Sequence, residues 1–445
     1  MFWFDFNWQI QSFLNQFWWQ INFLLLVILV ILGYLSYKKP VYAVGLTIIM
    51  LPTYLFRSQI FGIPFTFLEL CILITFLGWL INKSFELWAK GSGLKAQSSK
   101  LLEYRWPITL ILIAATISIF ISPDLRAATG LWKAYFVEPI LFFLVLINVA
   151  KTDRDKKIIL WSLGISTLAI SFLAIFQKFT GFGIAEAAWM APAHRRVTSF
   201  FTSPNAVGLY LGPITAIYLG WLISEIKNLK ITALKLLILI PACLAILFTV
   251  SQGTWLGLAA AVIFLAYFAC PPKVASGDRR RGWSKKWTAL VVLIVIIAVL
   301  IIPITRNTLW PVITFQDASG QNRLALLQMS RQHLFSNTKN FIFGAGTLGF
   351  AEIQNQAREP LKMEALLYPH NIFLNFWLEI GLLGLIAFIW LVIKFFKKGF
   401  IRIKNDWLTL GLMAAVVVII VHGLIDVPYF KNDLAILFWI IIGLL

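Results

Sequence analysis

Long hydrophobic runs separated by short polar connections dominate the pattern of residues along this chain. A helix of about 20 apolar residues spans the hydrocarbon core of a bilayer. The runs are too long and too evenly apolar for the alternating strands of a membrane β-barrel. The pattern therefore predicts transmembrane helices near residues 20–37, 41–56, 64–81, 106–122, 132–150, 158–177, 205–223, 231–250, 253–270, 287–304, 371–393, 407–425 and 432–445.

Composition supports the same class of protein. Hydrophobic residues make up 60% of the 445 positions and charged residues only 13%, whereas soluble domains carry about 25% charged residues. We predict an all-α, polytopic transmembrane helical bundle of 12–13 spans. The three cysteines, Cys71, Cys243 and Cys270, lie in or at the edges of apolar runs without the spacing of a metal site or a redox pair.

Four segments follow from this pattern. Residues 1–18 mix aromatic and amide side chains, which is typical of a helix lying at the membrane interface. Residues 19–304 hold the first ten predicted transmembrane helices, and residues 371–445 hold the C-terminal ones. Residues 305–370 form a long connection whose amphipathic stretch at 322–335 predicts a small helical cap that carries site residues.

Basic residues gather in every second connection between the predicted spans. Six of these connections contain 25 of the 38 Lys and Arg residues. By the positive-inside rule they are cytoplasmic, so the loops at 178–204 and 305–370 face outward and the cap is extracytoplasmic. Much of the net charge of +19 is explained by topology, and no nucleic-acid partner is implied.

His370 and Asn371 follow a proline and begin an apolar helix at the predicted outer surface. An imidazole at this height can take a proton from an attacking hydroxyl. The alternative is an interfacial histidine that only anchors the start of the helix.

Arg195, Arg196 and Arg323 lie on the predicted outer side, against the positive-inside trend. A planar guanidinium group suits a phosphate. Alternatively these arginines are solvated, or are paired with acidic residues of the cap at positions 352, 359 and 364.

Further ionisable residues lie within the predicted spans. His422 and Asp426 are four apart on one predicted helix and share a face near its outer end, which predicts a buried pair. The pair either orients a site or only satisfies the two residues' own hydrogen-bonding needs within the bundle. The others are too scattered to trace a proton relay: Glu69, Lys133, Glu138 and Glu379. The string Gly344–Gly349 matches a dinucleotide-binding motif by letter, but no parallel strand precedes it, which favours a tight turn.

Several segments together resemble the superfamily of O-antigen ligases and O-antigen polymerases, which are bacterial membrane glycosyltransferases. They are RVTSFFTSPNAVG (196–208), SQGTWLGL (251–258), NRLALLQMS (322–330), FGAGTLGF (343–350), PHNIFLNFWLEIGLLGL (369–385) and HGLIDVPYF (422–430). Their order, their spacing and the position of the large outer loop also fit. The resemblance covers about the second half of the chain closely.

The resemblance implies that a glycan on a polyprenyl diphosphate carrier is transferred to an acceptor hydroxyl, on a glycolipid or another glycan, at the outer face of the bacterial cytoplasmic (inner) membrane. Membrane lipids are the other implied partners, and neither a cofactor, nor a metal, nor a nucleotide sugar is implied. Arg323 matches the arginine that contacts the diphosphate, and His370 matches the histidine proposed to activate the acceptor. Arg195, Arg196 and Gln252 are expected near the diphosphate, with His422, Asp426 and Asn371 in support.

One position departs from the family pattern. Gln252 stands where the family usually has arginine, and a neutral amide cannot offset diphosphate charge. Ligase, polymerase and protein-glycosylating activities all stay open, because nothing in the sequence reports on the acceptor. A transporter or flippase of lipid-linked glycan is the alternative from another class. A non-catalytic relative that binds such a lipid is a third.

Overall fold

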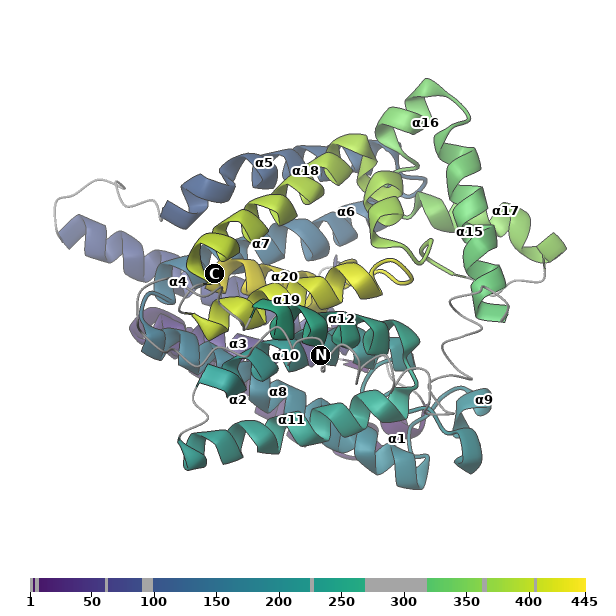
Figure 1. Ribbon diagram of the computed structural model, residues 1–445. Helices are drawn as coiled ribbons and strands as arrows, with labels where there is room; N and C mark the ends of the chain where they lie inside the picture. The colour runs from purple at the N-terminus through teal and green to yellow at the C-terminus, as the bar shows by residue number, and fades with distance from the viewer. Residues whose placement is uncertain are drawn as a thin grey trace, which may run out of the picture.

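Helices that run along a common direction build most of the computed structural model shown in Figure 1. The structure describes residues 3–4, 8–60, 63–89, 99–224, 228–268, 318–361, 366–403 and 406–445. The tenth predicted span, residues 287–304, and the first part of the predicted outer loop, residues 305–317, lie outside these ranges.

Eight helical segments among the described residues are long and apolar enough to cross a membrane. They are α2 (Trp18–Lys38), α4 (Phe67–Ala89), α5 (Ser99–Ile121), the continuous run of α6 (Leu125–Trp132), a π-helical turn (Lys133–Val137) and α7 (Glu138–Val149), then α8 (Asp153–Thr180), α10 (Pro204–Ser224), α11 (Leu229–Thr249) and α18 (Ile372–Arg402). Four shorter apolar helices accompany them: α3 (Pro40–Ile49), α12 (Gln252–Phe268), α19 (Trp407–His422) and α20 (Asn432–Leu444). The predicted all-α membrane bundle is confirmed, and the chain is a multi-pass membrane protein.

The second predicted span is shorter than the hydropathy pattern indicated. Instead of reaching residue 56, α3 ends at Ile49, and a 3-10 helix (Leu51–Leu55) leads into a hairpin of β2 (Phe56–Ile60) and β3 (Ile63–Thr66). Pro52 lies in the first turn of the 3-10 helix and favours this change of direction. The apolar run was misread because a strand and a helix end can be as hydrophobic as a span.

The N-terminal segment is only partly helical. The strand β1 (Trp3–Phe4) pairs antiparallel with β2, so that the sheet has the order β1-β2-β3, and α1 (Trp8–Gln16) follows it. Because the hairpin follows α3, it lies at the end of the bundle opposite the Lys38–Lys39 connection. The pairing therefore places the start of the chain at the same end as the loops that are predicted to face outward.

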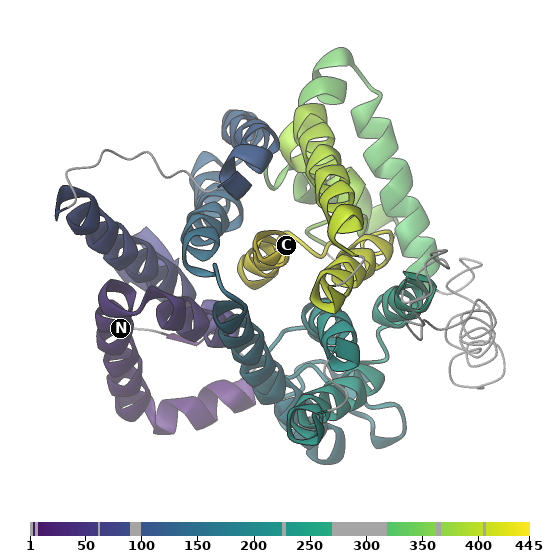
Figure 2. The same ribbon diagram turned by 60° about the vertical axis from the view of Figure 1, so that its left-hand side comes forward.

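The core lies around α19 and α20, which are central in Figure 2. Every residue of α20 is buried, in keeping with its uniformly apolar sequence. Glycines allow α19 to approach α10 closely, because a side-chain carbon added at Gly411 would lie 2.8 Å from the carbonyl oxygen of Ile217. This packing fixes the N-terminal ends of α10 and α12 and the C-terminal end of α19 beside one another.

The N-terminal part of α18 contains a break that the hydropathy pattern did not predict. Ile380 and Gly381 have non-helical dihedral angles, and Gly381 adopts φ 75° and ψ 176°. The carbonyl oxygen of Leu378, next to the break, accepts a hydrogen bond of 2.7 Å from the backbone N–H of Ala345. Irregular backbone inside a membrane protein is tolerated where protein groups satisfy it in this way.

The described part of the predicted outer loop forms three helices: α15 (Ala318–Leu334), α16 (Thr338–Phe343) and α17 (Gly349–Leu361). Leu326, Met329 and Phe350 make a small core with Leu378 of α18. Between α16 and α17, the glycine-rich string forms a turn with positive φ at Gly344 and Gly346, as expected from the absence of a preceding strand. Thr347 is buried, and its hydroxyl lies 2.8 Å from that of Ser118 in α5.

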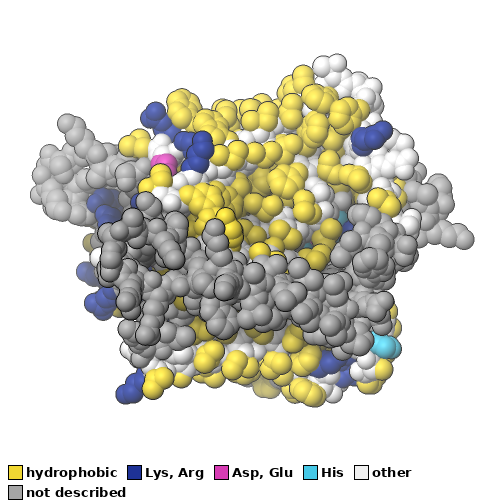
Figure 3. Space-filling model, viewed as in Figure 1, with side chains coloured by type: hydrophobic (Ala, Val, Ile, Leu, Met, Phe, Trp, Pro, Cys, Tyr) yellow, Lys and Arg dark blue, Asp and Glu magenta, His cyan; other side chains and the backbone are white. Residues whose placement is uncertain are grey.

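Hydrophobic side chains predominate among the described residues on the face seen in Figure 3. Lys and Arg side chains lie mainly toward its left-hand edge, where α4 and α18 end in Figure 1. Large apolar side chains such as Phe23, Phe120 and Phe179 are strongly exposed. A lipid environment accounts for this exposure.

Candidate functional site

A polar cavity of about 190 Å³ lies where several helix ends meet. Most of its charged residues are among the candidates selected from the sequence. Its lining consists of Arg196, Asn205, Val250, Gln252, Gly253, Arg323, His422, Ile425 and Asp426. They come from the loop before α10, the first turns of α10 and α12, α15, and the end of α19 with the segment that follows it. The fold thus brings together two arginines, a glutamine, a histidine and a carboxylate that are far apart in the chain.

The end of α11 fixes the side chain of Arg196. Its Nε donates a hydrogen bond of 2.9 Å to the carbonyl oxygen of Thr249, and one terminal nitrogen lies 3.3 Å from Oδ1 of Asn205 and 3.4 Å from the carbonyl oxygen of Val250. Free carbonyls at a helix C-terminus carry partial negative charge and favour a cation. Burial lowers the pKa of Arg196, but arginine stays protonated in proteins. The cavity therefore holds a fixed positive charge.

A buried glutamine that the sequence gave no reason to select holds the loop that carries Arg196. The side-chain oxygen of Gln177 in α8 accepts hydrogen bonds from the backbone N–H groups of Thr198 (3.0 Å) and Ser199 (2.6 Å). Its amide nitrogen donates to the carbonyl oxygen of Ser199 at 3.0 Å. Ser199 has φ 51°, a conformation that surrounding contacts must maintain. These hydrogen bonds hold the loop in the conformation that directs the Arg196 side chain into the cavity.

The start of α12 opens on the cavity. Val250 has φ 51° and reverses the chain between α11 and α12, so the first two residues of α12, Gln252 and Gly253, line the cavity. Backbone N–H groups at a helix N-terminus and the helix dipole attract anions. A β-carbon on Gly253 would lie 2.6 Å from Nε2 of His422, so only glycine leaves room for that imidazole.

Asp426 connects two histidines. Its Oδ1 lies 3.4 Å from Nδ1 of His370, and its Oδ2 lies 3.9 Å from Nε2 of His422. The backbone N–H of Val427 donates to Oδ1 at 2.8 Å. His422 and Asp426 are 2% and 8% exposed, so they form a buried pair. The predicted common helix is wrong, because α19 ends at His422 and Asp426 lies in the turn after it.

The same contacts determine the ionisation of Asp426. Burial acts to raise its pKa, but the contact with His370, the charges of His370 and His422 and the N–H of Val427 together hold the pKa below its usual value. Asp426 is therefore an anion throughout the neutral range.

His370 precedes Asn371, the N-cap of α18, and has φ 51°. Its side chain is 26% exposed, and it contacts Asp426 of the cavity lining. Asn371 caps α18, since its Oδ1 accepts hydrogen bonds from the N–H groups of Phe373 (3.0 Å) and Leu374 (3.1 Å). The Asn371 amide also donates to the carbonyl oxygen of Leu424 at 3.1 Å, which ties the His370 junction to the segment that bears Asp426.

The structure separates Arg195 from the other predicted diphosphate ligands. Its guanidinium donates to the carbonyl oxygens of Met190 and Lys178, both at 3.0 Å. It thereby braces the loop that holds α9 (Ala187–Met190) and the 3-10 helix Pro192–His194. The predicted pairing of arginines with Glu359 and Glu364 involves side chains that lie outside the described part of the chain.

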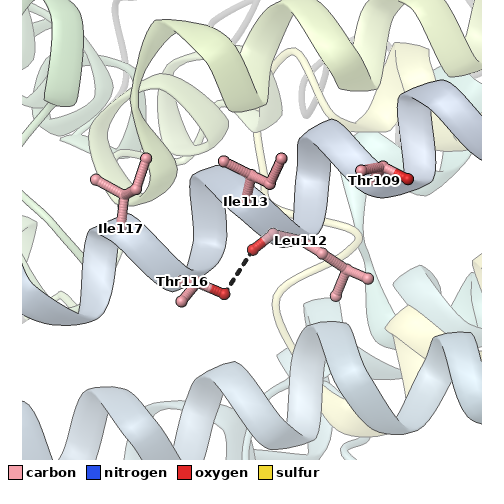
Figure 4. A pocket seen from close by; sticks show the side chains of 5 residues that line it. All are labelled: Thr109, Leu112, Ile113, Thr116 and Ile117. Carbon is pink, nitrogen blue, oxygen red and sulfur yellow. Dashed lines mark hydrogen bonds between the residues drawn. The ribbon is translucent and has the colours of Figure 1, made fainter.

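A second cavity of about 320 Å³ is apolar and lies along α5, as Figure 4 shows. Thr109, Leu112, Ile113, Thr116 and Ile117 line it. Four of these side chains are exposed on the apolar surface and Leu112 is half-buried, so the cavity is a groove that lipid chains would fill. Among the described residues, no three His, Cys, Asp or Glu side chains are grouped as metal ligands.

Fold and cavity together define a multi-pass membrane protein with a polar, arginine-lined cavity at one end of its helices. The family model described as O-Antigen ligase matches residues 236–389, about a third of the chain. The resemblance to the O-antigen ligase superfamily is thereby confirmed over this region, which contains Gln252, Arg323 and His370. No curated protein matches the chain.

The matched domain supports a function of the O-antigen ligase or polymerase type and a glycosyltransferase-like enzyme. Substrates of this family are, in general, a lipid-linked glycan and an acceptor. Arg196, His422 and Asp426 lie outside the matched residues, and the fold brings them to the residues within it.

Proposed function

We propose that the protein transfers a glycan from a polyprenyl diphosphate carrier to an acceptor hydroxyl at the outer face of the bacterial cytoplasmic membrane, with inversion at the anomeric carbon and without a metal. The observation that carries this proposal is the convergence of Arg196, Arg323 and the N-terminus of α12 on one cavity whose carboxylate, Asp426, also contacts His370.

The cavity provides groups for a diphosphate leaving group. Two guanidinium groups, the amide of Gln252 and the N-terminal end of α12 surround a space of about 190 Å³. Negative charge grows on the diphosphate as the glycosidic C–O bond breaks, and fixed positive groups stabilise that charge. The lipid tail would leave the cavity toward the bilayer, since the helix ends that form it lie at the membrane surface.

His370 is arranged as a general base. Because Nδ1 faces the carboxylate of Asp426 at 3.4 Å, Nδ1 carries the proton and Nε2 is the basic nitrogen. The acceptor oxygen attacks the anomeric carbon while its proton passes to Nε2, and the bonding electrons leave with the diphosphate. A single displacement of this kind inverts the anomeric configuration. Asp426 stabilises the imidazolium that forms.

The position of the cavity favours transfer over transport. Its lining comes from the ends of helices and the segments beside them on one side of the bundle. A transporter with alternating access places its site near the middle of the membrane, between repeats. A non-catalytic relative stays an alternative because of Gln252.

Reconstituted transfer tests the proposal. The assay contains purified protein in lipid, a polyprenyl-diphosphate-linked oligosaccharide, candidate acceptors, and release of polyprenyl diphosphate as the readout. We expect Arg323→Ala to lower turnover by about 10²–10³-fold and His370→Ala by about 10²–10⁴-fold. Arg331→Ala is the matched control, because Arg331 is exposed on the same helix as Arg323. Full activity in folded Arg323→Ala and His370→Ala proteins would refute the mechanism.

Substitutions at Gln252 distinguish an enzyme from a protein that only binds the lipid-linked glycan. Gln252→Arg adds a third guanidinium group to the cavity, so we expect faster release of the diphosphate from a weak enzyme, while Gln252→Leu should slow it. If neither wild type nor Gln252→Arg releases the carrier with any acceptor, although the lipid-linked donor binds, the non-catalytic alternative is correct.

A further inference from the structure

A second polar cluster lies within the bundle, next to the start of α20, which follows the segment that carries Asp426. Nζ of Lys133, in the π-helical turn, is 2.7 Å from Oε2 of Glu69 in α4 and 3.9 Å from Oε1 of Glu138 in α7. The amide of Asn432 donates to the other oxygen of Glu69 at 3.3 Å. The sequence suggested that these ionisable residues were scattered, whereas the fold gathers three of them.

The two carboxylates of this cluster are not equivalent. Glu69 accepts hydrogen bonds from both Lys133 and Asn432. Within the described residues, neither oxygen of Glu138 has a hydrogen-bond partner, and its side chain is 1% exposed. The ion pair is therefore Glu69–Lys133, because Nζ of Lys133 is 2.7 Å from Glu69, whereas Glu138 approaches it only to 3.9 Å.

This cluster and the π-helical turn bond to the end of the segment Gly423–Lys431, which connects α19 to α20. Asn432, the first residue of α20, is bound to Glu69. The hydroxyl of Tyr429 donates to the carbonyl oxygen of Tyr135 in the π-helical turn at 3.0 Å. Asp426, earlier on the same segment, contacts His370 and His422. The segment is therefore bonded both to the Lys133 cluster and to the candidate site.

The side chain of Glu69 is 7% exposed and that of Lys133 is 33% exposed. Charges inside a membrane bundle are costly, and a partly exposed ion pair adds little net stability. The presence of this pair is explained if it fixes a position. We propose that the Glu69–Lys133 pair is a positioning element: through Asn432 it fixes the segment Gly423–Lys431, so that the Asp426 carboxylate faces both His370 and His422. This inference rests on the proposed function, because it assigns the pair a task in the same site.

Three isosteric variants test the proposal in the transfer assay. Glu69→Gln breaks the ion pair, Glu138→Gln replaces the more distant carboxyl group of the cluster, and Glu103→Gln breaks the 2.6 Å contact with Lys398 at the opposite end of the bundle. We expect Glu69→Gln to lower kcat roughly tenfold to a hundredfold with the donor KM unchanged, because Arg196 and Arg323 do not move. The two controls should retain wild-type kcat.

Rescue by a conservative variant distinguishes positioning from a structural defect. Glu69→Asp retains the carboxylate that pairs with Lys133 and accepts from Asn432, so it should restore most of the kcat that Glu69→Gln loses. A kcat in Glu69→Asp as low as in Glu69→Gln, or a loss in Glu69→Gln that falls on the donor KM instead of kcat, would overturn the proposal.

Hydrogen exchange provides a readout that does not need transfer. We expect backbone amides of residues 423–432 to exchange faster in Glu69→Gln than in wild type, Glu138→Gln or Glu103→Gln. If Glu69→Gln does not fold, the double variant Glu69→Met/Lys133→Met, which removes both charges, replaces it. Unchanged exchange in these residues would refute positioning. A wild type without transfer activity but with the expected exchange would refute only the proposed function.

Discussion

At the scale of single residues, the contacts of Asp426 depend on how the helices pack. Spacing along the chain identified the neighbour His422, but for the wrong reason, since the two do not share a helix. The contact between Asp426 and His370 joins residues 56 positions apart. No local pattern encodes such a contact, because it depends on how α18 and α19 pack. Gln177 was missed for the same reason: its partners are backbone groups of another segment.

Asp426→Asn tests the charge at this position while retaining its shape. The folded-state pKa of Asp426 lies below that of the unfolded chain, because His370, His422 and the N–H of Val427 outweigh the effect of burial. Such a group stabilises the fold above its unfolded pKa of about 3.9, and the stabilisation is lost as pH falls toward the folded value.

We therefore expect wild type to be more stable than Asp426→Asn at neutral pH and the difference to shrink below about pH 4. Thermal unfolding in detergent across a pH series measures this difference, and the transfer assay should show about a 10²-fold loss of turnover. A stability difference that does not change with pH would contradict the assignment of Asp426 as the ionised partner of the two histidines.

At the scale of elements, hydropathy located the helices and missed their interruptions. A window of apolar residues reports that a segment avoids water, so α8, α10 and α11 were predicted closely. It does not report where the backbone leaves the helical conformation. The chain turns into a 3-10 helix after Ile49, and α18 breaks at Gly381, within equally apolar sequence. These interruptions connect the outer hairpin and the outer-loop helices to the bundle.

Gly381→Ala should destabilise the junction between α16 and α18. The conformation at φ 75° and ψ 176° is accessible essentially only to glycine, and an added β-carbon would lie 2.7 Å from the carbonyl oxygen of Ile342. We expect a cost of about 1–3 kcal/mol, seen as a lower Tm. Gly130→Ala is the control, because a β-carbon at Gly130 meets nothing within 4 Å. Equal Tm values for the two variants would show that the break does not depend on glycine.

At the scale of the whole molecule, the candidate site is assembled from both halves of the chain. Arg196 comes from the loop before α10, Arg323 from α15, and Asp426 from the segment before α20. The resemblance selected Arg323 and His370 because they lie in recognisable segments. It gave no means of grouping Glu69 with Lys133 and Asn432, which come from three elements. Sequence therefore predicted the principal polar residues better than the contacts that orient them.

The charge pattern also predicts which connections between helices face each side of the membrane. Transfer from a lipid-linked donor at the outer face requires that the loop containing Glu186 and the hairpin containing Gln59 both face outward. Both side chains are exposed. Lys151, in the connection between α7 and α8, should face the cytoplasm by the positive-inside rule.

Single-cysteine labelling in intact cells decides this arrangement. In a background without Cys71, Cys243 and Cys270, we expect Glu186→Cys and Gln59→Cys to react with a membrane-impermeant maleimide, because water reaches both from outside. Lys151→Cys should react only after the cells are permeabilised. Phe172→Cys, on the exposed apolar surface of α8, is the unreactive control. Labelling of Lys151→Cys alone in intact cells would place the cavity on the cytoplasmic side. The arginines would then face the compartment that the other basic loops already occupy, and the proposed outer-face transfer would be excluded.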